Sequence, residues 1–293
     1  MKHIGLVVDE GADLPKDIIQ KHNIEIVPIK LDWPEIKDLP GKNTFQKMRE
    51  AEKRGIKSFG KTSQPSPKDF LDAYKKQFEN FEEIVCITLT SKLSGTYNSA
   101  IQAKNFLLPE QQKKVFVVDS LNVSGGEALL VFKAIELIKN TELNAEKIAE
   151  KLKNLPSRIH LRVIFKDPKW IEASGRISSP VANWVRKMSK IGIRPILGFR
   201  DGVLKAIGIK TGAKDIPLAL FREIKEKTKK LQEENKKIWV IISHGDNLTS
   251  AQKLKKMIKK EIKGASVLYI TLVNNIIGAI AGPDALALSW TEG

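Results

Sequence analysis

The segment that decides the fold is IVCITLTSKLSGTYNSA, residues 84–100. Its first six residues are apolar or β-branched and predict a buried strand of a parallel sheet. The turn SKLSG follows, and apolar spacing through Tyr97 and Phe106 predicts a helix after it. Small hydroxyl residues at a strand end and a helix start favour anion binding, because free N–H groups and the helix dipole attract negative charge. Gly95 would let a ligand approach the backbone closely.

A second hydroxyl-rich stretch precedes another predicted helix. In KTSQPSPKDF, residues 61–70, a capping Ser66 is followed by Pro67 and then by Asp69. This pattern is typical of a helix start. The residues before the cap, including Thr62, are expected to form a loop. The two stretches together predict two hydroxyl-bearing loops at helix N-termini.

Residues 1–156 are predicted to form a first α/β domain. Short apolar runs begin at residues 4, 24, 84 and 115, and amphipathic stretches separate them. This alternation predicts a parallel sheet with helices on both faces. Ligands bind at the carboxyl ends of strands in such sheets, where Asp9, Ser94 and Asp119 would lie. We expect Asp9 and Asp119 to orient loops by accepting hydrogen bonds from backbone N–H groups.

Residues 157–293 are predicted to form a second α/β domain with a mixed sheet and helices, after a boundary near Pro156. Two strands should flank the turn at residues 200–202, and a further strand should cover KIWVIISH, residues 237–244. One long helix is expected over residues 216–233, another after Ser250, and two or three strands at the end of the chain.

The composition is that of an ordinary globular protein. The 293 residues are 42% hydrophobic and 29% charged, which is enough for two domains with sizeable cores. No apolar stretch approaches the roughly 18 residues that a membrane span needs. The single cysteine, Cys86, lies inside a predicted strand and is expected to be an inert core thiol in a reducing, cytoplasmic setting.

The formal charge of +16 raises the question of a nucleic-acid or membrane partner. The excess lysine and arginine is scattered over predicted amphipathic helices, which indicates solvated helix faces. There is no zinc-finger spacing and little aromatic content to stack bases. We therefore expect no sequence-specific nucleic-acid binding, and a transient contact with an anionic membrane surface stays open.

Six motifs, in this order, resemble the DegV family of bacterial fatty-acid-binding proteins. They are VDEGADLP (8–15), TSQPS (62–66), LSGTYNSA (93–100), VVDS (117–120), GRIS (175–178) and RPIL (194–197). TSQPS and LSGTYNSA are the specific signals, and the resemblance extends nearly from end to end. It implies two α/β domains that pack side by side and enclose one long-chain fatty acid, such as palmitate or oleate.

The resemblance also assigns site residues. It implies that the hydroxyls of Thr62 and Ser94 bind the fatty-acid carboxylate. Further pocket residues are expected around them, including Gln64 and the secondary candidates Ser63, Gly95, Thr96, Arg176, Lys210 and Ile280.

Two of these positions depart from the family pattern. Ile280 stands where the family usually has a histidine, and Lys210 stands where it has an arginine. An isoleucine cannot form a hydrogen bond, and a lysine cannot replace the bidentate contact of arginine with phosphate. His244 follows a predicted strand and is expected to be a structural hydrogen-bonding residue.

The leading hypothesis is a carrier rather than an enzyme, with no metal and no cofactor. The resemblance implies that a separate fatty-acid kinase phosphorylates the bound acid for phospholipid synthesis. No Walker-type loop or dinucleotide fingerprint is present in the sequence. One alternative is a hydrolase of acyl esters with Ser94 as nucleophile, although LSG lacks the flanking glycines of a nucleophile elbow. The other alternative is a basic nucleic-acid-binding protein.

Overall fold

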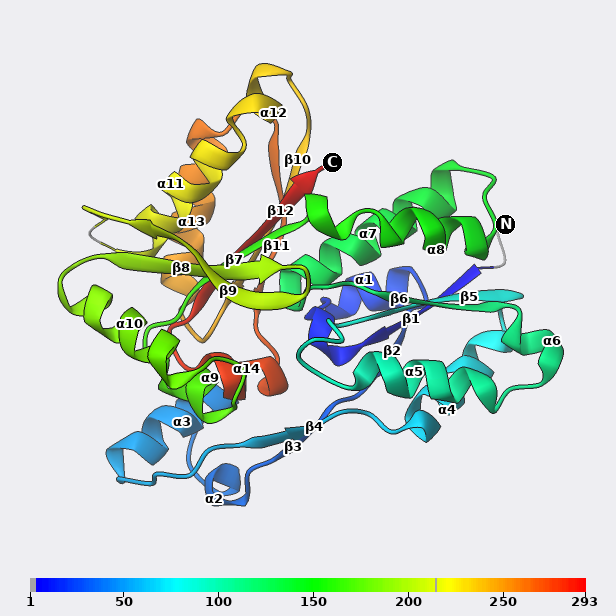
Figure 1. The fold of residues 1–293 in the computed structure, drawn as a ribbon, viewed down its shortest axis with the longest axis horizontal. Helices are drawn as coiled ribbons and strands as arrows, with labels where there is room; N and C mark the ends of the chain where they lie inside the picture. The colour runs from blue at the N-terminus through cyan, green and yellow to red at the C-terminus, as the bar shows by residue number, and fades with distance from the viewer. Residues whose placement is uncertain (1–3, 214) are drawn as a thin grey trace. The chain divides into compact units, whose positions relative to one another are not determined.

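The computed structural model describes residues 4–213 and 215–293 (Figure 1). Contacts divide the described chain into two compact units. The first unit contains residues 4–30, 63–159 and 200–203, and the second contains residues 31–62, 160–199 and the described residues from 204 onward. The domain division at residue 156 stays a prediction, and these units differ from it by placing residues 31–62 with the C-terminal half and residues 157–159 and 200–203 with the N-terminal half.

The first unit has a four-stranded parallel sheet. Its strands lie in the order β2 (Glu25–Val27), β1 (Ile4–Asp9), β5 (Glu83–Thr88) and β6 (Val115–Asp119). All three strand pairs are parallel. The predicted parallel sheet is confirmed, and its carboxyl edge carries the loops that follow Asp9, Thr88 and Asp119.

Helices cover both faces of this sheet (Figure 1). On one face, α4 (Pro67–Phe78) and α5 (Thr96–Asn105) pack against Ile84 and Cys86 of β5. Because side chains alternate along a strand, Val85 and Ile87 point to the other face, where α7 (Ser124–Asn140) and α8 (Ala145–Lys153) contact β5. Cys86 is fully buried in this core, as predicted.

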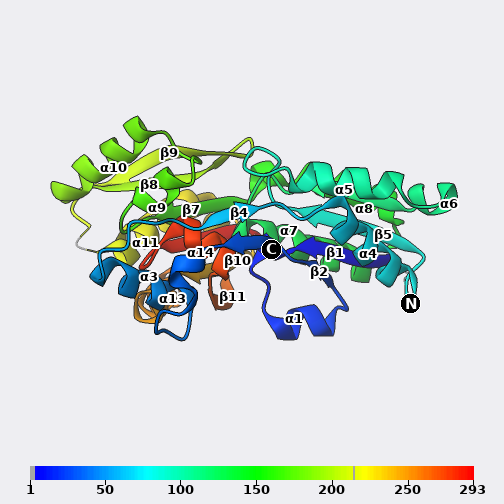
Figure 2. The same ribbon diagram turned by 90° about the horizontal axis from the view of Figure 1, so that it is seen from below.

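The other elements of the first unit are short. They are α1 (Lys16–Lys21), α6 (Pro109–Gln112) and the 3₁₀ turns Glu10–Ala12 and Pro156–Arg158. Helix α1 buries none of its residues and stands away from the sheet in Figure 2.

Helix α4 begins where the sequence predicts. The Ser66 hydroxyl accepts a hydrogen bond from the N–H of Asp69 at 3.3 Å, and the Asp69 carboxylate accepts one from the N–H of Ser66 at 2.7 Å. This reciprocal pair is a capping box, and it satisfies two backbone donors at the helix start.

The second unit has a mixed six-stranded sheet. Its strands lie in the order β11 (Ala265–Leu272), β10 (Ile238–His244), β12 (Leu286–Glu292), β7 (His160–Ile164), β8 (Arg194–Arg200) and β9 (Val203–Lys210). The β10–β11 pair is parallel, whereas β12 pairs antiparallel with both β10 and β7, and β7 pairs antiparallel with β8. The predicted mixed sheet is confirmed.

One core of the second unit joins this sheet to two helices. Helices α11 (Ile216–Lys227) and α13 (Leu248–Glu261) bury Leu220 and Leu254 against Val240 and Leu288 of the sheet. The remaining helices of the C-terminal half are α9 (Lys169–Ala173), α10 (Ser179–Lys190), α12 (Lys229–Glu233) and α14 (Asn275–Ala281).

The segment before the TSQPS motif holds elements that the sequence analysis missed. They are β3 (Lys30–Asp32), α2 (Pro34–Lys37), α3 (Thr44–Lys53) and β4 (Lys61–Ser63). Strands β3 and β4 form a two-stranded sheet, so Thr62 lies in a strand and not in the expected loop. Phe45 and Met48 of α3 pack with Trp33 and Trp170 in a second core of this unit.

Two predictions about helices of the C-terminal half were wrong in detail. The long helix is broken at Thr228, whose hydroxyl donates a hydrogen bond to the carbonyl of Ile224 at 2.7 Å. Helix α13 begins earlier than expected, because Asn247 caps it by accepting from the N–H of Ser250. The expectation of two or three strands at the end of the chain is confirmed by β11 and β12, and α14, which contains Ile280 and was not predicted, lies between them in the sequence.

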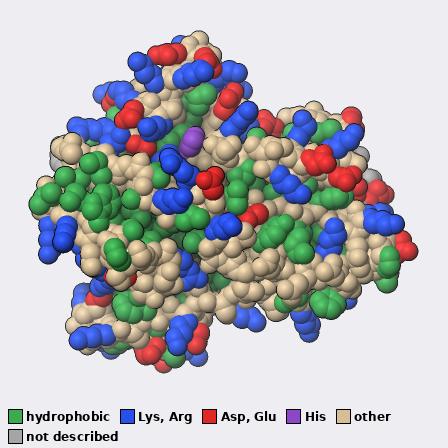
Figure 3. Space-filling view, viewed as in Figure 1, with side chains coloured by type: hydrophobic (Ala, Val, Ile, Leu, Met, Phe, Trp, Pro, Cys, Tyr) green, Lys and Arg blue, Asp and Glu red, His purple; other side chains and the backbone are tan. Residues whose placement is uncertain are grey.

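The described helices include none long and apolar enough to cross a membrane. Lysine and arginine side chains are spread over the face shown in Figure 3. Hydrophobic side chains gather on the same face over α10 and the β8–β9 hairpin, where Ile191 and Ile209 are exposed.

Candidate functional site

Two buried or half-buried carboxylates hold the loop that follows β5. Asp9, at the end of β1, accepts hydrogen bonds from the N–H groups of Gly11 at 2.8 Å and Leu89 at 2.7 Å. Asp119, at the end of β6, accepts from Ser91 at 3.2 Å and from Leu121 at 2.9 Å. The predicted orienting role of both acids is confirmed. Strands on either side of β5 therefore fix the start of the loop that carries Ser94.

Thr90 anchors the same loop from within. Its N–H donates to the carbonyl of Asn122, and its buried hydroxyl donates to the carbonyl of Gly202, both at 2.9 Å. The hydroxyl also accepts a hydrogen bond from the N–H of Lys92 at 3.2 Å. The turn between β5 and α5 is thus bonded along its length, which reduces the conformations open to Ser94.

Ser94 lies next to the start of α5 and pairs with Thr96. Their hydroxyl oxygens are 2.8 Å apart, and the N–H of Thr96 donates to Ser94 at 3.4 Å. Thr96 is fully buried, whereas Ser94 is half-buried. When the Thr96 hydroxyl donates to Ser94, the proton of Ser94 is left for an acceptor outside the loop.

Gly95 is needed because Gln64 lies against it. A Cβ atom at position 95 would be only 2.0 Å from the Gln64 side-chain oxygen. The Gln64 amide reaches across to α5 and donates to the Ser99 hydroxyl at 3.1 Å. The TSQPS and LSGTYNSA motifs are therefore joined by a side-chain hydrogen bond that a larger residue at position 95 would disturb.

Thr62, in the second unit, is paired with Arg176. A guanidinium N–H of Arg176 donates to the Thr62 hydroxyl oxygen at 3.0 Å, and another donates to the carbonyl of Ser174 at 3.2 Å. Burial lowers the pKa of Arg176 from its ordinary value. Because a guanidinium cannot accept a hydrogen bond, the proton of Thr62 is left free to be donated elsewhere.

The structure groups the predicted site residues into two sets. Thr62 and Arg176 lie together in the second unit, and Gln64, Ser94, Gly95 and Thr96 lie together in the first. Ser63 is exposed at the end of β4. The roles of all these residues in ligand binding stay predictions.

Lys210 is engaged by acidic residues of α11. Its ammonium group lies 2.9 Å from the Glu223 carboxylate and 2.7 Å from that of Glu226. Glu223 is nearly buried and also accepts a hydrogen bond from Arg162. Hydrogen bonds to both glutamates raise the pKa of Lys210, although burial, the largest influence, opposes them. The positive charge of Lys210 is thus neutralised within its own unit.

The other departure from the family pattern, Ile280, is half-buried in the last turn of α14. The loop after this helix is held by a salt bridge from Arg49 of α3 to Asp284 at 3.1 Å. His244, at the end of β10, accepts a hydrogen bond from the N–H of Asn247 at 3.1 Å, which confirms its structural role.

Glu127 is a buried acid near the Ser94 loop that the sequence analysis missed. Neither of its carboxylate oxygens has a hydrogen-bond partner among the described residues. Burial raises the pKa of Glu127 well above its ordinary value, and the charges of Asp9, Asp13 and Asp119 raise it further. Burial likewise raises the pKa of Asp9, to about 7. In the sequence, Glu127 is the single acid in GGEALLVF, an otherwise apolar run after VVDS, and this pattern could have indicated a buried carboxyl.

The sequence is similar to that of known proteins over nearly its whole length. A family model described as "Uncharacterised protein, DegV family" matches residues 3–293. A fatty acid-binding protein of Thermotoga maritima is 30% identical over 294 residues, covering 97% of this chain and 96% of the relative.

Solved structures agree with this match. A hypothetical protein from Thermotoga maritima, whose structure is described as revealing a fatty acid binding function, has a TM-score of 0.76 at 25% identity, with 100% of both chains covered. A stearic acid-binding protein from Eubacterium ventriosum has a TM-score of 0.82 at 23% identity, covering 100% of this chain and 98% of that one. At this lower identity, the second structure shows the shared fold alone.

The contact between Gly95 and Gln64 predicts coupling between two substitutions. Gly95→Ala should push the Gln64 side chain away and break its bond to Ser99, lowering the free energy of unfolding by about 1 kcal/mol. In a Gln64→Ala background, the same change should have almost no effect, because nothing remains to displace. A double-mutant cycle by urea unfolding measures the coupling, and additive losses would contradict it.

The buried carboxyls predict that stability falls as pH rises. A carboxyl whose folded pKa is raised keeps its proton in the native state while the unfolded chain releases it. The contribution of these carboxyls to the free energy of unfolding should therefore decrease from about pH 5 to pH 8, by at most about 1.4 kcal/mol per pH unit for each such group. The lowered pKa values of His22, His160 and His244, caused chiefly by burial, act in the opposite direction up to about pH 6.5. Glu127→Gln should flatten this decrease, whereas Glu110→Gln, an exposed control, should not. A pH dependence that is the same in the wild type and in Glu127→Gln would contradict the prediction.

Proposed function

The chain belongs to the DegV family, and we propose that it binds one long-chain fatty acid, with Thr62 and Ser94 as hydrogen-bond donors to the carboxylate. The relative from Thermotoga maritima that matches nearly the whole chain is a fatty acid-binding protein. The observation that carries the proposal is the state of the Thr62 hydroxyl. Its oxygen already accepts a hydrogen bond from Arg176, so its proton is available to an anion.

Arg176 gives Thr62 a second advantage. A cation bonded to the hydroxyl oxygen polarises the O–H group and makes it a stronger donor to a negative partner. The pair also places a positive charge close to the carboxylate without a direct contact being required. Arg176 thus acts through Thr62 in this proposal, as a positioning and polarising residue.

Ser94 offers a donor in a comparable state. It lies beside the first turn of α5, where the helix dipole favours negative charge. The hydroxyl oxygens of Ser94 and the fully buried Thr96 are 2.8 Å apart, and when Thr96 is the donor of this pair, the proton of Ser94 is left for the ligand. In this state, neither hydroxyl donates a hydrogen bond to another protein group. Each could therefore donate to a carboxylate without first losing a bond within the protein.

Head and tail of the ligand would contribute differently to affinity. Burial of about fifteen methylene groups at ~0.8 kcal/mol each supplies on the order of 12 kcal/mol before association costs are subtracted. Each charge-assisted hydrogen bond to the carboxylate adds roughly 1.5–3 kcal/mol. The acyl chain, as in palmitate or oleate, would therefore dominate affinity, and the hydroxyls would set the orientation and avoid an unpaired buried charge.

We further propose that the protein is a carrier that presents its fatty acid to a separate kinase. An acyl-phosphate would bring more negative charge than a carboxylate and would need more donors. At the two positions that depart from the family, Ile280 has no donor and Lys210 is bound to Glu223 and Glu226. These features support poor acyl-phosphate formation rather than poor fatty-acid binding.

The two alternative functions have less support. Within the described chain, the Ser94 hydroxyl forms its hydrogen bonds with Thr96 and not with a histidine or a carboxylate that could activate a serine nucleophile. The scattered cations on the face in Figure 3 do not favour a nucleic-acid groove. Contact with an anionic membrane surface stays a prediction, and the exposed Ile191 and Ile209 are the first residues to substitute in testing it.

The head-group assignment predicts selectivity between acid and alcohol. Thr62→Val and Ser94→Ala should each weaken binding of palmitate by roughly 1–3 kcal/mol, because each removes one donor to the carboxylate. Thr62→Ser should retain affinity, since it keeps the hydroxyl and its bond to Arg176. Fluorescence titration with palmitate and with hexadecanol provides the comparison, with Ser250→Ala of α13 as the matched control. Equal losses for acid and alcohol would mean that the hydroxyls only hold the local structure.

The departures at positions 210 and 280 predict weak phosphorylation of the bound acid. Wild-type protein should retain fatty acid yet support slow acyl-phosphate formation by a fatty-acid kinase. Ile280→His combined with Lys210→Arg should increase the rate without tightening lipid binding, because the two substitutions add donors that an acyl-phosphate needs and a carboxylate does not. Wild-type turnover equal to that of a family member with histidine and arginine at these positions would contradict the proposal.

A further inference from the structure

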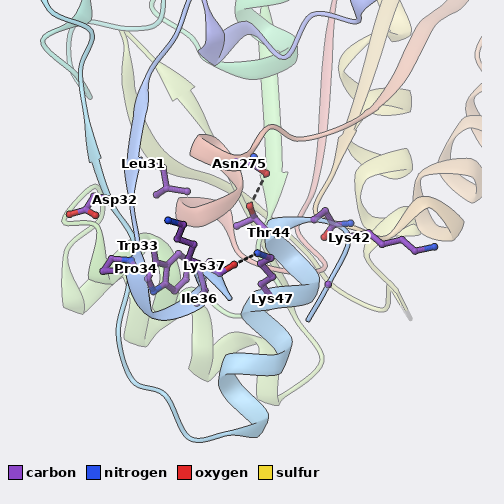
Figure 4. A pocket seen from close by; sticks show the side chains of 12 residues that line it. Leu31, Asp32, Trp33, Pro34, Ile36, Lys37, Lys42, Thr44, Lys47 and Asn275 are labelled. Carbon is purple, nitrogen blue, oxygen red and sulfur yellow. Dashed lines mark hydrogen bonds between the residues drawn. The ribbon is translucent and has the colours of Figure 1, made fainter. Parts of the chain in front are cut away.

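The second unit has a pocket of about 670 Å³, formed by the segment between β3 and α3 together with Asn275 of α14 (Figure 4). The charged groups of this pocket do not converge. In Figure 4, Lys37 lies among the apolar lining residues and Lys42 extends away from the pocket. Asp32 also lines it. Positive charge is gathered instead on helix α13 of the same unit.

Helix α13 buries one side and exposes the other. Leu254 and Ile258 are fully buried in the core that α13 shares with α11 and the six-stranded sheet, and Figure 1 shows the two helices side by side. Four lysines lie on the other side of α13, and we call them the lysine patch: Lys255, Lys256, Lys259 and Lys260. Lys255, at the margin of the patch, is half-buried, and the other three are exposed.

No acid neutralises the lysine patch within the described chain. Lys253, beside the patch, forms an ion pair with Asp215. Glu261 is the single acid of α13, and it pairs with Lys225 of α11 at 2.7 Å. Glu261 directly follows Lys260, and adjacent residues of a helix do not face each other. All four charges of the patch are thus available to a partner.

An ordinary solvated helix face balances its lysines with acids. In α12, Lys229 and Lys230 each have a glutamate four residues later, at 3.8 Å. In α13, the residues four positions after Lys255 and Lys256 are again lysines. Like charges at this spacing destabilise a helix. The helix dipole favours cations in the last turn only, so it does not compensate the charges of Lys255 and Lys256. A partner of opposite charge would relieve this repulsion.

The other side chains of α13 favour a protein partner. The helix contains no arginine and no aromatic residue, the groups that bind phosphates in bidentate fashion and stack on bases. Leu248, at its first position, is its one exposed large hydrophobic residue. A single such residue gives little apolar area for insertion into a membrane. Nucleic acids and lipid surfaces are therefore poorer matches than an acidic protein surface.

The spacing of the patch matches an acidic helix. Four residues of an α-helix rise about 6 Å. Lys255 and Lys259 therefore form one row with this repeat, and Lys256 and Lys260 form a second. Glutamates four residues apart on another helix have the same repeat.

We propose that the lysine patch binds an acidic helix of a partner protein, with the rows of lysines facing rows of carboxylates. Lysine ammonium groups are strongly hydrated point charges, and long-range attraction between opposite charges speeds association. The patch therefore suits a transient complex that forms rapidly. This contact does not depend on fatty-acid binding.

A hydrocarbon-stapled, alanine-rich peptide with two rows of glutamates at four-residue spacing is a suitable probe. A second peptide of the same composition, with its glutamates spread evenly around the helix, controls for charge alone. By fluorescence anisotropy, the row peptide should bind saturably and about five-fold more tightly than the spread peptide. Its affinity should fall as salt is added, because the contacts are exposed ion pairs.

Lys256→Gln combined with Lys260→Gln should weaken binding of the row peptide about five-fold, because it removes one row. The melting temperature should be maintained, since the change also removes a like-charge pair. Lys147→Gln combined with Lys151→Gln is the matched control. It removes the same charge at the same spacing from exposed positions of α8 and should change binding little. Palmitate binding should be unaffected by either pair, which separates this surface from the proposed carrier function.

Duplex DNA and phosphatidylglycerol vesicles test the other polyanions. The Lys256→Gln, Lys260→Gln variant should lose more affinity for the row peptide than for either of them. A larger loss for DNA or for vesicles would assign the patch to that partner and overturn the proposal. No saturable binding of the row peptide up to about 1 mM, equal affinities for the two peptides, or equal losses in the two lysine pairs would overturn it as well.

Discussion

The candidate site in the first unit depends on hydrogen bonds from one backbone loop to two flanking carboxylates. Asp9 and Asp119 end the strands on either side of β5 and bind the N–H groups of Leu89 and Ser91. A parallel sheet brings three strand ends to one edge, and only that arrangement lets acids from β1 and β6 hold the same loop. These hydrogen bonds position the loop that carries Ser94. The Ser94 hydroxyl lies beside that of Thr96, and Gln64 bonds to Ser99 in the helix that follows the loop.

Burial of two carboxyl groups near this loop costs electrostatic free energy. Asp9 and Glu127 are both fully buried, and Glu127 has no hydrogen-bond partner in the described chain. Burial makes the neutral form of both acids more favourable than in water.

Local signals made part of this arrangement predictable. The apolar run of β5, the capping box at Ser66 and the acids after β1 and β6 each leave a short, specific pattern in the sequence. Other features depend on residues far apart in the chain, which no local pattern records. The bond from Arg176 to Thr62, the engagement of Lys210 by Glu223 and the pocket beside Asn275 are of this kind. Helix α14 was missed because seven residues are too few for a clear helical period.

The central claim is that this DegV family member carries a long-chain fatty acid. The most direct measurement is mass spectrometry of the lipid released when protein purified from a bacterial host is denatured and extracted. The account predicts about one long-chain fatty acid per chain, with less retained by the Thr62→Val and Ser94→Ala variants. Recovery of no lipid, together with failure of the stripped protein to bind added palmitate or oleate, would contradict it.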